Sequence, residues 1–327
     1  MICSLNLDLN KRYYNEDQQN KLISILENVK YISDKDGTMH SITGFIENFK
    51  ITITETRIYL NGSLTKFYHG NNVVTLTKEE MSPAIKRLKQ VTGLPVQYAV
   101  IRRIDLAINI FLEQPYYIYL PYFEDSYGYI KGINQYKGIT YRKENRNTTS
   151  EFVIYNKLAE VCSQSPDVYN VVKVVMNEHN EKGIMRLELR LKKSVSMQLL
   201  PNGKKLTLPY LLSSKVRQRL AQIWFKTYRS IDKKCKPILS DPKGYKEMKD
   251  ALAAMQIKNM GKAKLMRSID DIARRCRWSA KKKSITKTAF YELFRKSIKS
   301  ILPPSYIELE QKILHGEELL KWLETRN

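Results

Sequence analysis

The sequence predicts an α+β protein, in which an antiparallel β-sheet region is followed by an all-α, basic region. Two observations support this fold class. Runs with the alternation or apolar content of strands recur up to residue 193, whereas helical spacing dominates after Pro201. This change places a domain boundary near residue 200, between an α+β domain over residues 1–200 and a basic helical domain over residues 201–327.

Strand signals surround one helix signal in the first 64 residues. Residues 2–8 alternate like a strand, and residues 17–29 have the apolar spacing of a short amphipathic helix. The runs within residues 41–64 predict antiparallel strands joined by tight turns, and Asn61-Gly62 has the composition of such a turn.

A helix and a long strand are expected next. Residues 78–93 predict a helix, with Thr77 as its cap and Gly93 at its end. Residues 98–112 form an apolar run interrupted by charged residues, which is typical of a strand with one polar face.

A hairpin, a helix and another strand complete the first region. GITYRK and EFVIYNK, joined by a polar turn at residues 144–149, predict the hairpin. Residues 157–180 predict a helix with a break near Ser165-Pro166, and residues 183–193 predict a strand.

Helical spacing describes the second region. The expected helices span residues 209–230, 243–257, 260–278, 287–299 and 305–325. Lys281, Lys282 and Lys283 are expected to form a short basic loop between two of these helices.

The net charge of +23 and the pI near 9.7 indicate a polyanionic partner, either nucleic acid or an anionic membrane. Residues 201–327 carry 30 Lys and Arg against 12 Asp and Glu, so the second region is expected to grip that partner. No run approaches ~18 consecutive apolar residues, and no membrane span is expected. The N-terminal run resembles a strand rather than a signal peptide. The four cysteines form no CxxC pair, which argues against structural zinc and fits a reducing cytoplasm.

Asp105 lies inside the apolar run of residues 98–112. On a strand it shares one face with Arg103 and Asn109, while apolar residues share the other face. A buried carboxylate is costly unless it is paired or bound to a cation. The pattern therefore predicts either a functional site or a structural Arg–Asp pair on a polar sheet face.

The strand at residues 183–193 repeats this design, with Glu188 between Arg186 and Arg190. A cross-strand ladder of salt bridges explains the pattern as well as a site does. Two acids on neighbouring strands can also bind Mg²⁺ or Mn²⁺ through their oxygens, and the flanking arginines can hold a phosphate. The repeated pattern favours a site with Asp105 and Glu188 as metal ligands.

Tyr155 lies in the run EFVIYNK, on one strand face with Glu151 and Lys157. A neighbouring cation favours the phenolate and so lowers the pKa of a tyrosine. Lys157 is therefore a candidate activator of Tyr155 as a nucleophile. The alternative is a packing role, because the chain has 21 tyrosines.

Aromatic side chains are interleaved with basic ones in the second region. Trp224, Tyr228 and Trp278 in such a setting suit stacking on unpaired bases beside phosphate contacts. A solvated basic helix face is the alternative, and residues 268–298 resemble a helix-turn-helix only loosely. The candidate DNA-contacting residues here are Lys215, Arg219, Arg274, Arg275, Arg277, Lys281, Lys282 and Lys283.

Four segments occur in a suggestive order: LTKFYHGNNVVTLTKEEMSPAIKRLKQVTG, VIRRIDLAINI, FVIYNKLAEV and GIMRLELRLKK. Together they resemble the filamentous-phage replication initiators of the gene II protein family. Staphylococcal rolling-circle plasmid initiators are more distantly similar in the last three segments. The resemblance covers roughly residues 60 to 230 and implies a nuclease- or relaxase-like domain on an antiparallel sheet.

That family nicks one strand of supercoiled DNA at an origin, keeps the 5′ end on a tyrosine and later rejoins the strand. The resemblance implies that Tyr155 is the nucleophile, with Lys157 and Glu160 as companions, and that Asp105 and Glu188 bind Mg²⁺ or Mn²⁺. The histidine pair of better-known relatives is absent. The third ligand therefore stays open among Glu151, His69 and Glu160, in that order.

The resemblance also implies the partners. These are the supercoiled origin duplex, the displaced single strand and the replication helicase and polymerase of a bacterial host, in its cytoplasm. Tyr141 is a candidate second tyrosine for the terminating cut. Two rivals remain at this point: a non-enzymatic, sequence-specific DNA-binding regulator of a phage or plasmid, and an RNA-binding or RNA-processing protein.

Overall fold

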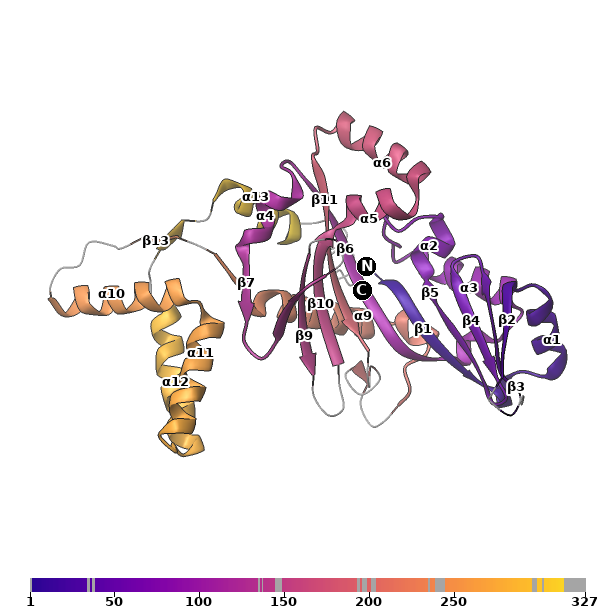
Figure 1. Cartoon of the computed structure of the whole chain (residues 1–327), viewed down its shortest axis with the longest axis horizontal. Helices are drawn as coiled ribbons and strands as arrows, with labels where there is room; N and C mark the ends of the chain where they lie inside the picture. The colour runs from indigo at the N-terminus through magenta and orange to yellow at the C-terminus, as the bar shows by residue number, and fades with distance from the viewer. Residues whose placement is uncertain are drawn as a thin grey trace.

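A ten-stranded antiparallel sheet organises the part of the chain that the computed structural model describes (Figure 1). The described residues are 2–33, 36, 39–134, 136, 138–144, 149–192, 195, 199–200, 204–234, 236–238, 245–295, 299–301 and 303–314. In spatial order the strands are β2 (Glu27–Ser33), β3 (Met39–Ile46), β4 (Phe49–Thr54), β5 (Arg57–Ser63), β1 (Ile2–Asn10), β6 (Val100–Leu112), β11 (Gly183–Leu191), β10 (Thr149–Asn156), β9 (Ile139–Glu144) and β8 (Ile130–Ile133).

Helices connect these strands and follow them. Before residue 200 they are α1 (Glu16–Ser24), α2 (Leu64–His69), α3 (Met81–Thr92), α4 (Tyr116–Tyr119), α5 (Lys157–Gln164) and α6 (Pro166–Glu178), with 3-10 turns η1 (Lys11–Tyr13), η2 (Val96–Tyr98) and η3 (Leu120–Tyr122). After it come α8 (Leu208–Leu211), α9 (Ser214–Ser230), α10 (Tyr245–Met260), α11 (Lys262–Arg275), α12 (Ala280–Arg295) and α13 (Pro304–Leu314). This architecture confirms the predicted α+β class.

Two small strand pairs lie outside the large sheet. β7 (Phe123–Ser126) pairs with β12 (Ile231–Lys233), and β13 (Lys236–Ile238) pairs with β14 (Lys299–Ile301). Three of these short strands, β12, β13 and β14, lie in the region for which only helices were predicted. Strands of three residues are too short to leave an alternation signal, so the sequence did not predict them.

One face of the central strands is apolar and carries the core. Leu106 of β6, Leu187 of β11 and Phe152 of β10 are fully buried there. Helix α9 covers this face, with the Trp224 ring centroid 5.4 Å from that of Phe152 and the Tyr228 ring stacked on Trp224. Both aromatic side chains are therefore core residues, and the prediction that they stack on DNA bases is wrong.

The helices just beyond residue 200 share this core. Leu208 and Leu211 of α8 and Leu220 of α9 belong to the same buried cluster as the sheet residues. The division into two domains at residue 200 stays a prediction. If the two regions fold separately, α8 and α9 belong with the sheet.

A second, smaller core lies among α10, α11 and α12, which gather at one end of the molecule (Figure 1). Ile257, Leu265, Met266 and Ile269 are buried there, and Phe290 packs against them. Helices α11 and α12 are joined by residues 276–279, so the predicted order of helix, turn and helix is present.

Two boundaries in the first region differ from the prediction. The helix expected over residues 17–29 ends at Ser24, and the chain continues as edge strand β2, whose Asn28 has a positive φ of 52°. Gly62 lies inside β5 rather than in a turn. A Cβ atom at Gly62 would lie 2.7 Å from the Phe49 ring, so close packing rather than chain reversal requires glycine there.

The other elements lie close to their predicted ranges. The helix expected at residues 78–93 is α3, which Gly93 ends with φ 68°. Its N-cap is Glu80 rather than the predicted Thr77, because the Thr77 and Glu80 side chains bond each other's backbone amides just before the helix begins. Ser165 separates α5 from α6, as expected. The triple lysine is not a loop but the first turn of α12. Residues 145–148 and 315–325 lie outside the described part of the chain.

We expect Trp224→Ala to lower the free energy of unfolding by about 3–5 kcal/mol, because it opens a cavity between α9 and the sheet. Chemical denaturation followed by circular dichroism measures this loss. Trp278→Ala is the matched control, since Trp278 is half-buried between α11 and α12, and its loss should stay below about 1 kcal/mol. Equal losses for the two variants would contradict the placement of Trp224 in the core.

Candidate active site

Strands β6, β11 and β10 are neighbours, and their register brings the predicted site residues onto one face. Tyr155 pairs with Arg186, which in turn pairs with Asn109. Further along the strands, Glu151 pairs with Arg190, which pairs with Asp105. Glu188 lies between these two rows on β11. The polar face predicted from alternation is therefore continuous across three strands.

Asp105 is held by its own strand. Arg103 donates two hydrogen bonds to it, with Nε 2.8 Å from Oδ1 and Nη2 2.7 Å from Oδ2. Asp105 is 2% exposed. Burial raises the pKa of this carboxyl, the charge of Glu188 raises it further, and Arg103 opposes both effects. The two acids are thus close enough to sense each other's charge.

Glu188 is shared by two arginines. Arg186 Nε donates to Oε2 at 2.9 Å, and Arg190 Nε donates to Oε1 at 2.6 Å. Burial acts to raise the pKa of Glu188, but the charges and hydrogen bonds of Arg186 and Arg190 outweigh burial and lower the pKa to about 2. Glu188 is therefore ionised. Arg190 also lies 3.9 Å from Glu151, whose other partners are Arg142 and Lys192. The cations on this face therefore outnumber the acids only when Arg142 and Lys192 are counted, and such an excess suits an incoming phosphate.

The Tyr155 hydroxyl points at this cluster. It donates to Glu188 Oε2 at 3.4 Å, and the side chain is 5% exposed. Burial raises the pKa of Tyr155 well above its ordinary value, although Arg186 acts to lower it. The Tyr136 ring stacks on Tyr155 with centroids 5.9 Å apart. Tyrosine and carboxylate are thus arranged as a proton donor and its acceptor.

Lys157 does not lie on the strand with Tyr155, as the sequence suggested. Strand β10 ends at Asn156, whose side chain accepts from the Ala159 amide and caps α5, so Lys157 is the first residue of that helix. Its ammonium donates to Glu160 Oε2 at 2.6 Å and to Asn72 Oδ1 at 2.7 Å. Burial lowers the pKa of Lys157, and Arg186 contributes in the same direction.

Two asparagines complete the polar network, and one of them, Asn72, was missed from the sequence. The Asn72 carbonyl accepts from Arg186 Nη1 at 3.1 Å and from Asn109 Nδ2 at 3.1 Å. Asn109 Oδ1 also accepts from Arg186 Nη1, at 3.0 Å. Strand alternation already placed Asn109 beside Asp105, whereas Asn72 comes from the loop between α2 and α3 and left no periodic signal. This loop holds the fully buried Arg186 in place.

The candidates for a third metal ligand have other partners. Glu151 lies on the same face, but its Oε1 is 2.7 Å from Lys192 Nζ. His69 ends α2 with Nε2 3.3 Å from Glu80 Oε2, and Glu160 pairs with Lys157. Within the described residues, no three His, Cys, Asp or Glu side chains are grouped as a metal site. The metal ligands therefore stay a prediction.

Tyr141 is not available as a second nucleophile. It pairs with Phe152 across β9 and β10, is fully buried on the apolar face and donates its hydroxyl to the Glu124 carbonyl. It therefore points away from the face that carries Tyr155.

The basic candidates of the second region lie on the surface of their helices. Lys215 and Arg219 are on α9, one turn apart. Most of the others are exposed around the α11–α12 turn, where Lys282 Nζ lies 4.7 Å from the Trp278 ring centroid. Those others are Arg274, Arg275, Arg277, Lys281, Lys282 and the half-buried Lys283.

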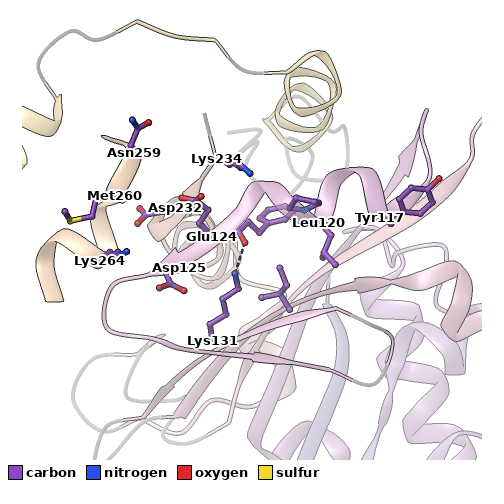
Figure 2. Close-up of a pocket in the computed structure, with 14 residues that line it drawn as sticks. Tyr117, Leu120, Glu124, Asp125, Lys131, Asp232, Lys234, Asn259, Met260 and Lys264 are labelled. Atoms are coloured by element: carbon purple, nitrogen blue, oxygen red, sulfur yellow. Dashed lines mark hydrogen bonds between the residues drawn. The ribbon is translucent and has the colours of Figure 1, made fainter. Parts of the chain in front are cut away.

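A cavity of about 660 Å³ lies elsewhere, between β7, β12 and the α10–α11 turn (Figure 2). Its lining mixes both charges, with Glu124, Asp125 and Asp232 facing lysines such as Lys131, which donates to the Phe123 carbonyl at 3.0 Å. None of the predicted site residues lines this cavity, so it has no part in the chemistry considered for Tyr155.

Comparison with known proteins identifies the family. The family model that matches describes the N-terminal region of the gene II replication-associated protein, and it covers residues 10–207, which is more than half of the chain. The chain belongs to this family. It is therefore a rolling-circle replication initiator of the filamentous-phage gene II type, and its partner is origin DNA. No curated protein and no solved structure matches it.

The match covers the initiator's whole polar cluster, including Asp105, Tyr155 and Glu188, and ends before α9. Helices α10–α12 with their basic surface lie outside it. Among the described residues, no helix has the length and hydropathy that crossing a bilayer requires.

The pKa of Glu188 generates a prediction about acid stability. Its folded-state pKa of about 2 lies below the ordinary value of 4.5, so its contribution is present above pH 4.5 and is lost as the pH falls towards 2. We expect the wild type to lose up to about 3 kcal/mol of unfolding free energy through this group across that window. Urea unfolding at several pH values should show a clearly smaller loss for Glu188→Gln. Glu55→Gln, at an exposed turn, is the control; if it behaves like Glu188→Gln, the arginine pairing of Glu188 is not the cause.

Proposed function

We propose that this initiator nicks and rejoins one DNA strand at its origin through a covalent 5′-phosphotyrosine on Tyr155. One observation carries the proposal: the Tyr155 hydroxyl donates to Glu188 inside a cluster of three arginines. A nucleophile, a proton acceptor and phosphate-binding groups are thereby assembled on adjacent strands.

The reaction exchanges one bond for another. The Tyr155 oxygen attacks the scissile phosphorus, its proton passes to Glu188, and the bond from phosphorus to the 3′ oxygen breaks. The 3′ oxygen leaves as a hydroxyl after taking up a proton, and the 5′ phosphate stays on the tyrosine. Rejoining reverses these steps. Arg103, Arg186 and Arg190 stabilise the charge on the phosphate oxygens.

The resting site is not yet reactive, and the arginines explain why. With a pKa of about 2, Glu188 is a weak base, and burial keeps the Tyr155 phenol protonated. A phosphate that draws the partly exposed Arg190 towards itself removes one of the two groups that lower the pKa of Glu188. The carboxylate then becomes a stronger base when substrate is bound.

Asp105 and Glu188 fit a divalent metal as part of a ligand set. Mg²⁺ is often held by one or two carboxylates together with substrate phosphates, and these two buried acids interact electrostatically. Their oxygens already accept hydrogen bonds from arginines, so neither is free for a cation before the phosphate arrives. Bound Mg²⁺ or Mn²⁺ would polarise the scissile phosphate.

One observation favours a second candidate, a non-enzymatic DNA-binding regulator. Each acid on the polar face has an arginine or lysine partner, as a purely structural salt-bridge ladder would. A regulator would shift the mobility of origin DNA without relaxing supercoiled plasmid in the presence of Mg²⁺ or Mn²⁺. The initiator proposed above would relax or nick it.

The helicase and polymerase of the bacterial host, in its cytoplasm, are the further partners that DNA synthesis from the nick would require.

Tyr155→Phe should abolish nicking of supercoiled origin plasmid, by at least about 10³-fold, because the ring stays while the nucleophilic oxygen is lost. Agarose gels measure nicking, and a mobility-shift assay should show origin binding within about twofold of wild type. Tyr136→Phe, which changes the ring stacked on Tyr155, is the control and should retain nicking. Persistent nicking by Tyr155→Phe would end the assignment of this tyrosine.

Divalent metal should bind the initiator more tightly when DNA is present. Since arginines occupy the carboxylates in free protein, Mn²⁺ alone should bind weakly, and an origin oligonucleotide should strengthen its binding at least about tenfold. Electron paramagnetic resonance of free Mn²⁺, with Tyr155→Phe protein to prevent cleavage, measures both affinities. Asp105→Asn should remove the gain. Equally tight binding without DNA would contradict a site completed by the phosphate.

A further inference from the structure

The polar face that carries Tyr155 extends along β1 to a second cluster of cations. Ser4 pairs with Asp105 and Asn6 with Arg103, so Ser4, Asn6 and Asp8 share that face, whereas the leucines between and beyond them are buried on the other side. Asp8 is 3% exposed and lies where Val100 begins β6. Asp8 therefore marks the end of the β1–β6 pairing on this polar face.

Asp8 organises this end of the face by holding two arginines. Arg57 Nη1 lies 2.9 and 2.7 Å from its two carboxylate oxygens, and Arg102 donates from Nε at 2.8 Å and from Nη2 at 2.6 Å. Arg102 reaches Asp8 because the β1–β6 register shifts at this point. One carboxylate thus anchors two guanidinium groups that are 37% and 53% exposed, and it neutralises only one of them.

A small pocket of about 180 Å³ lies between these arginines and two further cations, Arg12 and Lys205. The backbone beside Lys205 is held against β6, because the Ile101 amide donates to the Leu206 carbonyl at 2.8 Å. Four cationic side chains therefore surround one buried carboxylate. The pocket is smaller than the ~300 Å³ at which pockets for whole ligands begin, so it suits a single phosphate group rather than a complete nucleotide.

An aromatic platform borders the same pocket. Tyr13 and Tyr98 stack with centroids 4.9 Å apart and an interplanar angle of 12°, and the Arg12 guanidinium lies 4.6 Å from the Tyr13 centroid. Tyr98 is 51% exposed. An exposed ring beside a cationic pocket is the arrangement that proteins use to bind a base together with its backbone phosphate.

We propose that this cluster is a distal DNA-backbone subsite, in which Arg12, Arg57, Arg102 and Lys205 bind a phosphate and Tyr98 stacks on a neighbouring base. The proposal rests on the proposed nicking function for the identity of the strand. Asp8 and Tyr155 lie at the levels of Val100 and Asn109 along β6, about nine residues and so roughly 30 Å apart. At the stacked spacing of ~3.4 Å per nucleotide, a single strand bound at both places spans about nine nucleotides.

Binding of a fluorescein-labelled single strand of about 30 nucleotides, measured by anisotropy from about 50 to 300 mM NaCl, tests the subsite. Arg12→Ala/Lys205→Ala removes two exposed cations and leaves the Asp8 pairs intact. Each lost phosphate contact lowers the slope of log K against log salt by about 0.7 on single strands, so losing this one phosphate contact should lower the slope by about 0.7. At about 100 mM salt this corresponds to binding about fivefold weaker.

The control is Lys86→Ala/Lys89→Ala, which removes the same charge from the outer side of α3. The buried side of that helix belongs to the apolar core. All proteins carry Tyr155→Phe, so cleavage does not disturb the binding measurement. Equal slopes for the two double variants would overturn the subsite.

Tyr98→Ala tests the aromatic half of the proposal. It should weaken binding about tenfold at every salt concentration without changing the slope, because stacking releases no counterions. Unchanged binding would exclude stacking on Tyr98. If Tyr155 fails as the nucleophile but the slopes still differ, the nicking proposal falls and the subsite stands. If Tyr155 is the nucleophile but the slopes agree, the nicking proposal stands and the subsite falls.

Discussion

The pairing of buried carboxylates with arginines is the constraint on which the polar face of this initiator depends. Asp105 and Glu188 are buried among apolar strands, and each would be costly without its guanidinium partners. Arg186 is fully enclosed and is fixed in turn by the Asn72 carbonyl and the Asn109 side chain. Removing Arg103 would therefore leave the buried Asp105 without its arginine partner.

The same pairing links structure to reactivity. Arginines that stabilise Glu188 in free protein also suppress its basicity, and burial keeps Tyr155 protonated. The proposed reaction therefore starts only when a phosphate competes with Glu188 for Arg190. Asp8 repeats the design at the far end of the face, where two arginines share one carboxylate. Both clusters keep more positive than negative groups, which suits a polyanionic strand lying along the sheet.

Much of this arrangement was predictable because alternation on a strand fixes which side chains share a face. That rule placed Asp105 and Glu188 correctly on one polar face, with the adjacent tyrosine. It failed for Lys157, since a capping asparagine ended the strand one residue earlier. It could not find Asn72, which a loop brings in from elsewhere. Trp224 was wrongly predicted to stack on DNA bases. Helical spacing shows which side of a helix is apolar, but it does not show whether the sheet or a ligand packs against that side.

Sequencing the DNA-linked peptide tests the central claim most directly. The initiator is incubated with supercoiled origin plasmid and Mg²⁺ or Mn²⁺, the DNA is digested to a nucleotide remnant, and tryptic peptides are identified by mass spectrometry. The account predicts a 5′-phosphate remnant on the peptide that contains Tyr155. A remnant on any other tyrosine, or relaxed plasmid without a covalent adduct, would contradict it.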